Sequence, residues 1–392
     1  MSTWDVAVVG AGPAGAAAAL GALHAAPHLR VAMLDRADFP RDKACGDGIA
    51  PHVLDRLAEV GVTGLLDDHV PAARLRLDRD GRGAERVMAR PSYVVPRRVL
   101  DARLVDAACA AGATLVRHRV RDLAHDDHRV VLDPGPDEVG ATLVVGADGA
   151  RSVLRRHLGR PDGDVALALR GYAPVTPGRE GAQVITFGTL RQPSYAWSFD
   201  RGDGWANIGY GEVLGRTPGG VPGRTELIAH LEALLPGATR GAGDWRGAHL
   251  PLSGWRWSPP TGRVLLVGDA AGLVNPMTGE GIYYAVATGL AAGRAAAEAI
   301  AAGRPDDAGR RYRRAARAHL FPHLRHTAAA GLLSRRPPML DAGLRAAARD
   351  QRVFDDLVEL GLARGRITPA VARGLAGALL RPDHGGGRPC GS

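Results

Sequence analysis

The sequence is poor in cysteine and aromatic residues, and each shortage excludes a class of protein. Its 392 residues include three cysteines, Cys45, Cys109 and Cys390. They lie too far apart for a disulfide framework or a metal site, and no metal is expected. Aromatic residues make up 5% of the chain, which is too few for a platform on which nucleic-acid bases stack. Nucleic acid is therefore not an expected partner.

Long apolar runs are also missing. The most apolar helical stretch, residues 281–303, is interrupted by Arg294 and Glu298, which argues against a membrane-spanning helix. The first residues run directly into a predicted strand, so no signal peptide is expected. Together with the scarcity of cysteine, this predicts a reduced, cytoplasmic protein.

The formal net charge of +9 comes mainly from arginine. Such a charge can attract an anionic membrane or a phosphorylated substrate, but a solvated, arginine-rich surface is the simpler interpretation. The basic stretch Arg310–Arg314 keeps a peripheral membrane contact open as an alternative.

A dinucleotide-binding fingerprint opens the chain. The apolar residues 4–9 end in Gly10-Ala11-Gly12-Pro13-Ala14-Gly15 and pass into an Ala-rich helical pattern. Gly10 permits a tight turn, Gly12 lets a pyrophosphate approach the backbone, and Gly15 lets the helix pack closely. The pyrophosphate would lie at the helix N-terminus. A glycine-rich turn in an ordinary α/β protein is the alternative.

Asp35 ends the next apolar run, about 20 residues after Gly15. A carboxylate there accepts hydrogen bonds from ribose hydroxyls and repels a 2′-phosphate. The site therefore fits FAD or NAD better than NADP.

Two later stretches also end a strand in glycine and aspartate. Residues 143–152 contain Gly146-Ala147-Asp148-Gly149, where Asp148 can accept backbone N–H bonds and hold a sharp turn. Residues 263–282 contain Gly268-Asp269, a loop rich in proline and glycine, and the start of an Ala-rich helix at Gly281. Asp269 is placed to hold a polyol hydroxyl, and the helix points its positive end into the loop.

Two regions between these turns suit a ligand. The polar loop of residues 36–49 carries cations and the thiol of Cys45, although Cys45 could simply be a small buried residue. Residues 165–257 contain short β-like runs with Tyr195, Trp197, Trp205 and Tyr210. They predict a mixed sheet in which these rings line a substrate pocket or fill the core.

The three turns together resemble the FAD motifs of the para-hydroxybenzoate-hydroxylase-like flavoprotein fold. Over about residues 3–300 the chain most resembles the geranylgeranyl reductase family. Three stretches carry the resemblance: Pro40-Arg41-x-Lys43-x-Cys45-Gly46-x-Gly48, Tyr195-x-Trp197-x-Phe199, and residues 268–284. The family usually has proline after the Phe of the aromatic motif, whereas Asp200 stands here, which argues against the standard prenyl substrate.

The resemblance implies an α/β fold: a Rossmann-like FAD-binding domain, an inserted mixed β-sheet substrate domain and a C-terminal helical segment. We expect the FAD-binding domain to comprise residues 1–72, 95–164 and 261–303. A hairpin at 73–94 and the sheet at 165–260 would form the substrate domain. Residues 304–380 would be helical and residues 381–392 a flexible tail.

It also implies site residues. FAD would contact the nucleotide-end residues Gly10, Gly12, Pro13, Ala14, Gly15, Asp35, Arg36, Val120, Asp148 and Gly149. Its ribityl chain and ring would contact Asp269, Arg97, Cys45, Gly46, Gly279, Gly281 and Ile282. Tyr195, Trp197 and Phe199 would line the substrate pocket, and Cys45 or Tyr195 could relay a proton, as could a water.

The expected function is that of an FAD-dependent oxidoreductase. It would reduce carbon–carbon double bonds of an isoprenoid or related lipid or natural product by hydride transfer from N5 of the reduced flavin. A monooxygenase acting on an aromatic, polyketide or terpenoid substrate is the second hypothesis, and a non-catalytic flavin- or lipid-binding protein the third. No second nucleotide fingerprint identifies the electron donor, so NAD(P)H and a redox protein both remain candidates.

Overall fold

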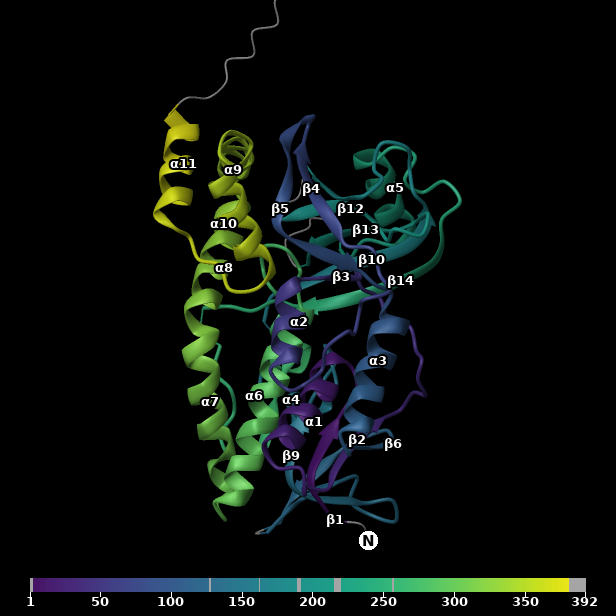
Figure 1. The fold of residues 1–392 in the computed structure, drawn as a ribbon, viewed down its shortest axis with the longest axis vertical. Helices are drawn as coiled ribbons and strands as arrows, with labels where there is room; N and C mark the ends of the chain where they lie inside the picture. The colour runs from purple at the N-terminus through teal and green to yellow at the C-terminus, as the bar shows by residue number, and fades with distance from the viewer. Residues whose placement is uncertain are drawn as a thin grey trace, which may run out of the picture.

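The computed structural model describes residues 3–126, 128–161, 163–188, 192–214, 220–255 and 257–380. The expected tail at 381–392 lies outside the described residues. Two β-sheets follow one another along the long axis, and helices from the end of the chain run beside both (Figure 1). This mixed α/β architecture agrees with the expected fold class.

The first sheet has the order β6-β2-β1-β9-β8-β7, with β15 paired to β9. β1 is parallel to both of its neighbours, β2 and β9, and its apolar side chains are buried on both faces, as parallel strands covered by helices require. The strands are β1 (Thr3–Val9), β2 (Val31–Asp35), β6 (Thr114–Arg117), β7 (Leu123–His125), β8 (Val130–Leu132), β9 (Val139–Gly146) and β15 (Val264–Leu266). Helices α1 (Pro13–Ala25), α2 (Pro51–Ala58), α3 (Arg97–Ala110), α4 (Val153–His157) and α6 (Ile282–Ala301) accompany it.

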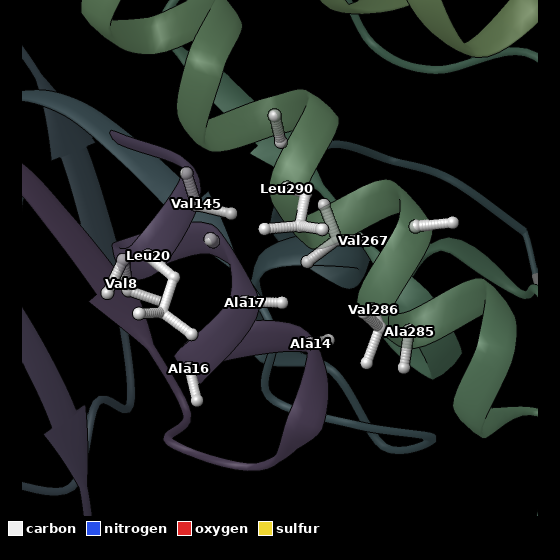
Figure 2. Packing of buried hydrophobic residues seen from close by; sticks show 14 of the residues in the cluster. Val8, Ala14, Ala16, Ala17, Leu20, Val145, Val267, Ala285, Val286 and Leu290 are labelled. Carbon is white, nitrogen blue, oxygen red and sulfur yellow. The ribbon is translucent and has the colours of Figure 1, made fainter. Parts of the chain in front are cut away.

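Small residues let α1 and α6 pack backbone to backbone. A Cβ added at Gly289 would lie 2.3 Å from the Ala14 carbonyl oxygen, and one at Gly293 would lie 2.0 Å from that of Ala18. Contacts advance in the same direction along both helices, so α1 and α6 run parallel. Figure 2 shows Ala17 of α1 facing the apolar side chains of α6 across this contact. The packing therefore fixes the N-terminal ends of both helices in relation to the first sheet.

The second sheet has the order β14-β10-β13-β12-β11-β4-β5-β3. Its strands are β3 (Gly48–Ile49), β4 (Ala72–Arg79), β5 (Arg82–Val94), β10 (Val165–Pro174), β11 (Ala182–Phe187), β12 (Ser194–Asp200), β13 (Trp205–Val213) and β14 (Gly243–Pro251). The β4–β5 hairpin joins the later strands through β11, and β3 attaches the loop before it to β5. Helix α5 (Arg224–Leu234) buries Leu227 and Leu231 against this sheet.

Five helices follow α6 and the short 3₁₀ turn Pro305–Asp307; another 3₁₀ turn covers Gly268–Ala271. They are α7 (Ala308–His319), α8 (Phe321–Ser334), α9 (Pro337–Arg349), α10 (Gln351–Leu362) and α11 (Pro369–Leu380). Ala347 of α9 and Phe354 of α10 pack against Leu75 and Met88 of the hairpin. Figure 1 shows α9 and α10 beside β4 and β5. The C-terminal helices thus form part of the wall around the second sheet.

The basic stretch Arg310–Arg314 lies on α7, where Tyr312 is fully buried and donates a hydrogen bond to the Leu266 carbonyl. Arg310 and Arg311 pair with Asp307 and Glu298, and Arg313 donates to the Pro259 carbonyl. Three of the arginines in this stretch are therefore bound to partners within the protein. Within the described ranges, no helix is both long enough and apolar enough to cross a membrane.

Candidate functional site

A continuous cavity of about 1240 Å³ lies between the two sheets. Ligand pockets usually measure roughly 300–1,000 Å³, so this cavity has room for more than one group. Its wall includes every expected site residue except Gly15: Gly10, Gly12, Pro13, Ala14, Asp35, Arg36, Cys45, Gly46, Arg97, Val120, Asp148, Gly149, Tyr195, Trp197, Phe199, Asp269, Gly279, Gly281 and Ile282.

The glycines of the first turn are required by close packing. Gly10 has φ +98°, and a Cβ there would lie 2.4 Å from the Ala147 carbonyl oxygen in the turn after β9. A Cβ at Gly15 would lie 1.8 Å from the Gly10 carbonyl oxygen. Gly15 therefore lets α1 pack closely on β1, and it is the one expected site residue that does not line the cavity.

The nucleotide end of the cavity combines a carboxylate with a helix N-terminus. Asp35 accepts hydrogen bonds from the backbone N–H of Ala11 at 2.9 Å and of Ala37 at 3.0 Å. Helix α1 begins after Gly12, which has no side chain to cap the free N–H groups. A guanidinium nitrogen of Arg41 lies 3.3 Å from the Cβ position of Gly12. Positive potential and open backbone donors at one point suit a pyrophosphate.

The second and third turns add two carboxylates. Asp148 accepts from the Val153 N–H at 2.7 Å through one oxygen, while its other oxygen is buried without a partner among the described residues. Burial raises the pKa of this carboxyl. Lys43 Nζ donates a hydrogen bond to the Asp269 carboxylate at 3.3 Å, and Arg155 donates one to the Asp269 backbone carbonyl at 3.2 Å. A cradle shaped by glycine, with an unsatisfied buried oxygen, fits a dinucleotide such as FAD.

Arg97 forms a buried ion pair beside Cys45. Its guanidinium donates to both carboxylate oxygens of Asp101, at 2.7 and 2.9 Å, and Arg41 approaches the same carboxylate at 3.1 Å. Burial opposes the charge of Arg97, but the Asp101 carboxylate raises its pKa. Burial raises the pKa of the Cys45 thiol despite the opposing charge of Arg97, so the thiol keeps its proton at neutral pH.

A buried amide holds the Cys45–Gly46 loop in position. Asn207 Nδ2 donates to the Cys45 carbonyl and to Asp47 Oδ2, both at 2.8 Å, and its Oδ1 accepts from Trp197 Nε1 at 2.8 Å. Asp47 also accepts from the Tyr172 hydroxyl at 2.5 Å, and burial raises its pKa to about 6. The sequence analysis missed Asp47 and Asn207. Asp47 lies within the Cys45–Gly48 motif, which could have identified it as a site residue. No motif in the sequence contains Asn207.

The three aromatic residues of β12 share one face because they alternate along the strand. Tyr195 and Trp197 have ring centroids 5.9 Å apart, and Trp197 and Phe199 have theirs 6.4 Å apart. The Phe199 ring is 3.5 Å from the Cβ position of Gly46. Tyr195 donates its hydroxyl hydrogen to the Thr278 carbonyl, and burial raises its pKa. The aromatic face therefore connects the Cys45 loop with the loop before α6.

Asp200, which departs from the family motif, forms hydrogen bonds with the backbone. Its carboxylate accepts from the Gly181 N–H at 2.6 Å and from the Gly202 N–H at 2.8 Å, and it does not line the cavity. Asp200 therefore shapes a turn at the end of β12 and lies away from the cavity wall.

Glu280 is a further cavity residue that the sequence analysis missed, although it lies between Gly279 and Gly281 of the motif. Its carboxylate accepts from the Tyr283 N–H at 2.8 Å in the first turn of α6. Desolvation nevertheless raises the pKa of Glu280 to about 7. The cavity therefore contains a carboxyl group that can hold or release a proton near neutral pH.

The far wall of the cavity is apolar and comes partly from helices that the sequence analysis did not assign to the site. α9 to α11 contribute Met339, Leu344, Leu357, Val358, Val371 and Leu375, opposite Leu75, Leu77, Met88 and Ile185 of the second sheet. The sequence predicts that residues 304–380 are helical, but it does not indicate what these helices cover.

This fold and this cradle define an FAD-dependent oxidoreductase. The model of a family described as "FAD binding domain" matches residues 3–175. A geranylgeranyl bacteriochlorophyll reductase-like protein from Thermoplasma acidophilum shares the fold, with a TM-score of 0.80, 21% identity and coverage of 96% of both chains.

Two curated relatives narrow the class. The chain is 36% identical to a menaquinone reductase of Mycolicibacterium smegmatis, in an alignment of 338 positions that covers 76% of each chain. It is 34% identical to digeranylgeranylglycerophospholipid reductase 1 of Methanopyrus kandleri, in an alignment of 318 positions that covers 76% of this chain and 81% of the relative. The chain belongs to the geranylgeranyl reductase family of FAD-dependent oxidoreductases.

Proposed function

We propose that this enzyme reduces carbon–carbon double bonds in a long, neutral substrate built from isoprene units. One observation carries the proposal: the cavity continues from the glycine-rich turns, past Cys45, to an apolar wall formed by β4, β11 and α9–α11. A wall of this kind suits a hydrocarbon chain. The names of the relatives, one a reductase of a quinone and one of a geranylgeranyl lipid, support the same substrate class.

The residues that would hold FAD follow from the cradle. Gly10, Gly12, Pro13 and Asp35 would bind the ADP half, with the N-terminus of α1 facing the pyrophosphate. Asp269 would hold the ribityl chain. Arg97, Gly279, Gly281 and Ile282 would surround the ring. When bound, FAD supplies a hydride from its reduced ring.

Reduction of an alkene needs a proton as well as a hydride, so the chain must deliver one. Cys45 lines the cavity as a neutral thiol and can donate directly. The Tyr195 hydroxyl hydrogen is engaged by the Thr278 carbonyl, which makes Tyr195 the weaker donor in this arrangement. We therefore propose Cys45 as proton donor and Tyr195 as a residue that positions the substrate. Glu280, with a pKa of about 7, can return a proton to this region.

The rest of the wall excludes water and orients the substrate. Trp197 and Phe199 cover the Cys45–Gly46 loop with rings, and the α6 N-terminus gives positive potential at Gly281. A dry, preorganised site of this kind strengthens every electrostatic interaction inside it.

The test is an anaerobic single turnover of the FAD-loaded enzyme. Dithionite reduces the bound cofactor, excess dithionite is removed, and a menaquinone with a geranylgeranyl tail is added. After quenching, air oxidises any quinol back to the quinone, so that mass spectrometry counts only the hydrogens gained at carbon–carbon double bonds. We expect a gain of two hydrogens for each reduced bond, and we expect Cys45→Ser to slow product formation without loss of FAD. A product that forms only with oxygen and gains an oxygen atom would establish hydroxylation instead.

The electron donor and the membrane contact remain separate predictions. NAD(P)H or a small redox protein would reduce the cofactor. The exposed charge left on α7 could meet an anionic bilayer, which sedimentation with anionic vesicles would detect.

A further inference from the structure

One polar side chain interrupts the apolar face of β11. Gln183, Ile185 and Phe187 alternate along this strand, so all three project from the same face, and all three line the cavity. Each lies opposite an aromatic residue of β12: Gln183 opposite Phe199, Ile185 opposite Trp197, and Phe187 opposite Tyr195. A glutamine therefore stands in a wall of rings and aliphatic groups.

The amide of Gln183 is unpartnered within the part of the chain that the structure describes. The residue is only 7% exposed, yet none of the described residues forms a hydrogen bond with its side chain. Buried polar groups are nearly always hydrogen-bonded, because an unmade bond costs the desolvation free energy. The hydroxyl of Ser92 on β5, another cavity residue, is also buried without a partner among the described residues. An unpaired amide in a cavity wall points to a ligand that completes its hydrogen bonds.

The position of Gln183 links it to the reactive end of the cavity. Its Nε2 lies 3.9 Å from the Cβ position of Gly48, in the same loop as Cys45. Gln183 is paired with Leu75 of the neighbouring strand β4, and Leu75 belongs to the apolar wall of the cavity. Gln183 thus stands between the Cys45 loop and the surface suited to a hydrocarbon tail.

The charges around this position favour a neutral ligand group. Arg97 is paired with Asp101, and Arg170 is paired with Asp42 at 2.6 Å. These two cations of the cavity wall are compensated, so an anionic head group would gain little from them. An amide offers one donor group and one acceptor, which suits a carbonyl or a hydroxyl oxygen.

We propose that Gln183 forms a subsite for a neutral oxygen of the substrate head group, a carbonyl or a hydroxyl. The subsite holds that oxygen beside the Cys45 loop and directs the tail along Leu75 toward α9–α11. This inference rests on the proposed function and adds to it the chemistry of the head group.

The test is equilibrium binding to the oxidised, FAD-loaded enzyme, where no turnover occurs. The probes are a geranylgeranyl naphthoquinone, geranylgeraniol, and a naphthalene that carries the same tail without oxygen. Gln183→Leu removes the amide, Gln183→Met does so while keeping the length of the side chain, and Ile185→Ala is the matched apolar control from the same face. Each variant must bind FAD as the unaltered enzyme does.

We expect the Gln183 variants to weaken binding of an oxygen-bearing probe about tenfold, the usual effect of one lost hydrogen bond. Binding of the naphthalene should be unchanged, whereas Ile185→Ala should weaken all probes alike. Loss for the quinone alone assigns a carbonyl, and loss for the alcohol alone assigns a hydroxyl. Equal loss for all probes, no loss, or a change in FAD affinity would overturn the subsite. Failure of the unaltered enzyme to bind any probe would instead contradict the proposed function.

Discussion

Replacing Asn207 by alanine should both destabilise the protein and loosen the Cys45 loop. Asn207 is fully buried and links three elements: its amide binds the Cys45 carbonyl, Asp47 and Trp197, each at 2.8 Å. The substitution removes all three hydrogen bonds at once. It supplies no replacement, because an alanine side chain has no polar atom.

The magnitude follows from the partners that remain. Asp47 keeps its bond from Tyr172, but the Cys45 carbonyl and the Trp197 Nε1–H lose the partner that Asn207 gave them. Each buried group left without a partner costs about 1–3 kcal/mol, so the loss should be about 2–6 kcal/mol. Folded proteins have a total stability of about 5–15 kcal/mol, so this loss is a large fraction.

Urea unfolding followed by tryptophan fluorescence measures the free energy of unfolding. The rate of maleimide labelling measures how accessible the Cys45 thiol is in its loop. Labelling uses a background in which Cys109 and Cys390 are serine, so that Cys45 is the remaining thiol. Asn207→Ala should label faster than its parent. Gln351→Ala is the control, because Gln351 is exposed and bonds Val87 and Asp355 at the surface. It should change stability by less than about 0.5 kcal/mol. Indistinguishable results for the two variants would refute the positioning role of Asn207.

Three further predictions concern the cradle and the buried carboxyls. Gly10→Ala should abolish FAD retention, measured by flavin absorbance after gel filtration, because φ is +98° and a Cβ would lie 2.4 Å from the Ala147 carbonyl; normal retention would contradict the tight turn. Glu280→Gln should remove an ionisation near pH 7 from the pH–rate profile, since burial raises that pKa to about 7, and an unchanged profile would exclude Glu280. Burial raises the pKa of Asp47 from 3.8 to about 6, so its contribution to stability is complete below about pH 4 and is lost as the pH rises through 6. Between about pH 4 and 6 this effect changes the free energy of unfolding by about 3 kcal/mol, and Asp47→Asn should remove that change in urea unfolding. An unaltered dependence of the unfolding free energy on pH would show that another group titrates.

The cofactor end of the cavity could be predicted because its information is local. Each turn is encoded within about ten residues as an apolar strand, glycines and an acidic side chain, and strand geometry then dictates where the turns lie. The structure shows Asp148 bonded to the backbone of the next helix, as the sequence predicted. Gly15 was identified for the right packing reason, although it does not reach the cavity.

The polar network around Cys45 could not be predicted in the same way. Asn207 lies 162 positions from Cys45, and nothing near it in the sequence distinguishes it from an ordinary polar residue of a strand. Its role appears only when β13 pairs with β12 and brings the amide to Trp197. Asp200 shows the opposite case: a departure from a local motif suggested a change of substrate, and the structure places its carboxylate in a turn away from the cavity wall.

The two ends of the cavity are held by different parts of the chain, so they can tolerate substitution to different degrees. The cradle depends on α1 and α6, whose backbones touch at Gly289 and Gly293 and leave no room for larger side chains. The far wall depends on α9–α11, where aliphatic side chains of similar size can replace one another at low cost. Substitutions in the far wall can therefore alter the length or shape of the apolar chamber while the cofactor cradle stays intact.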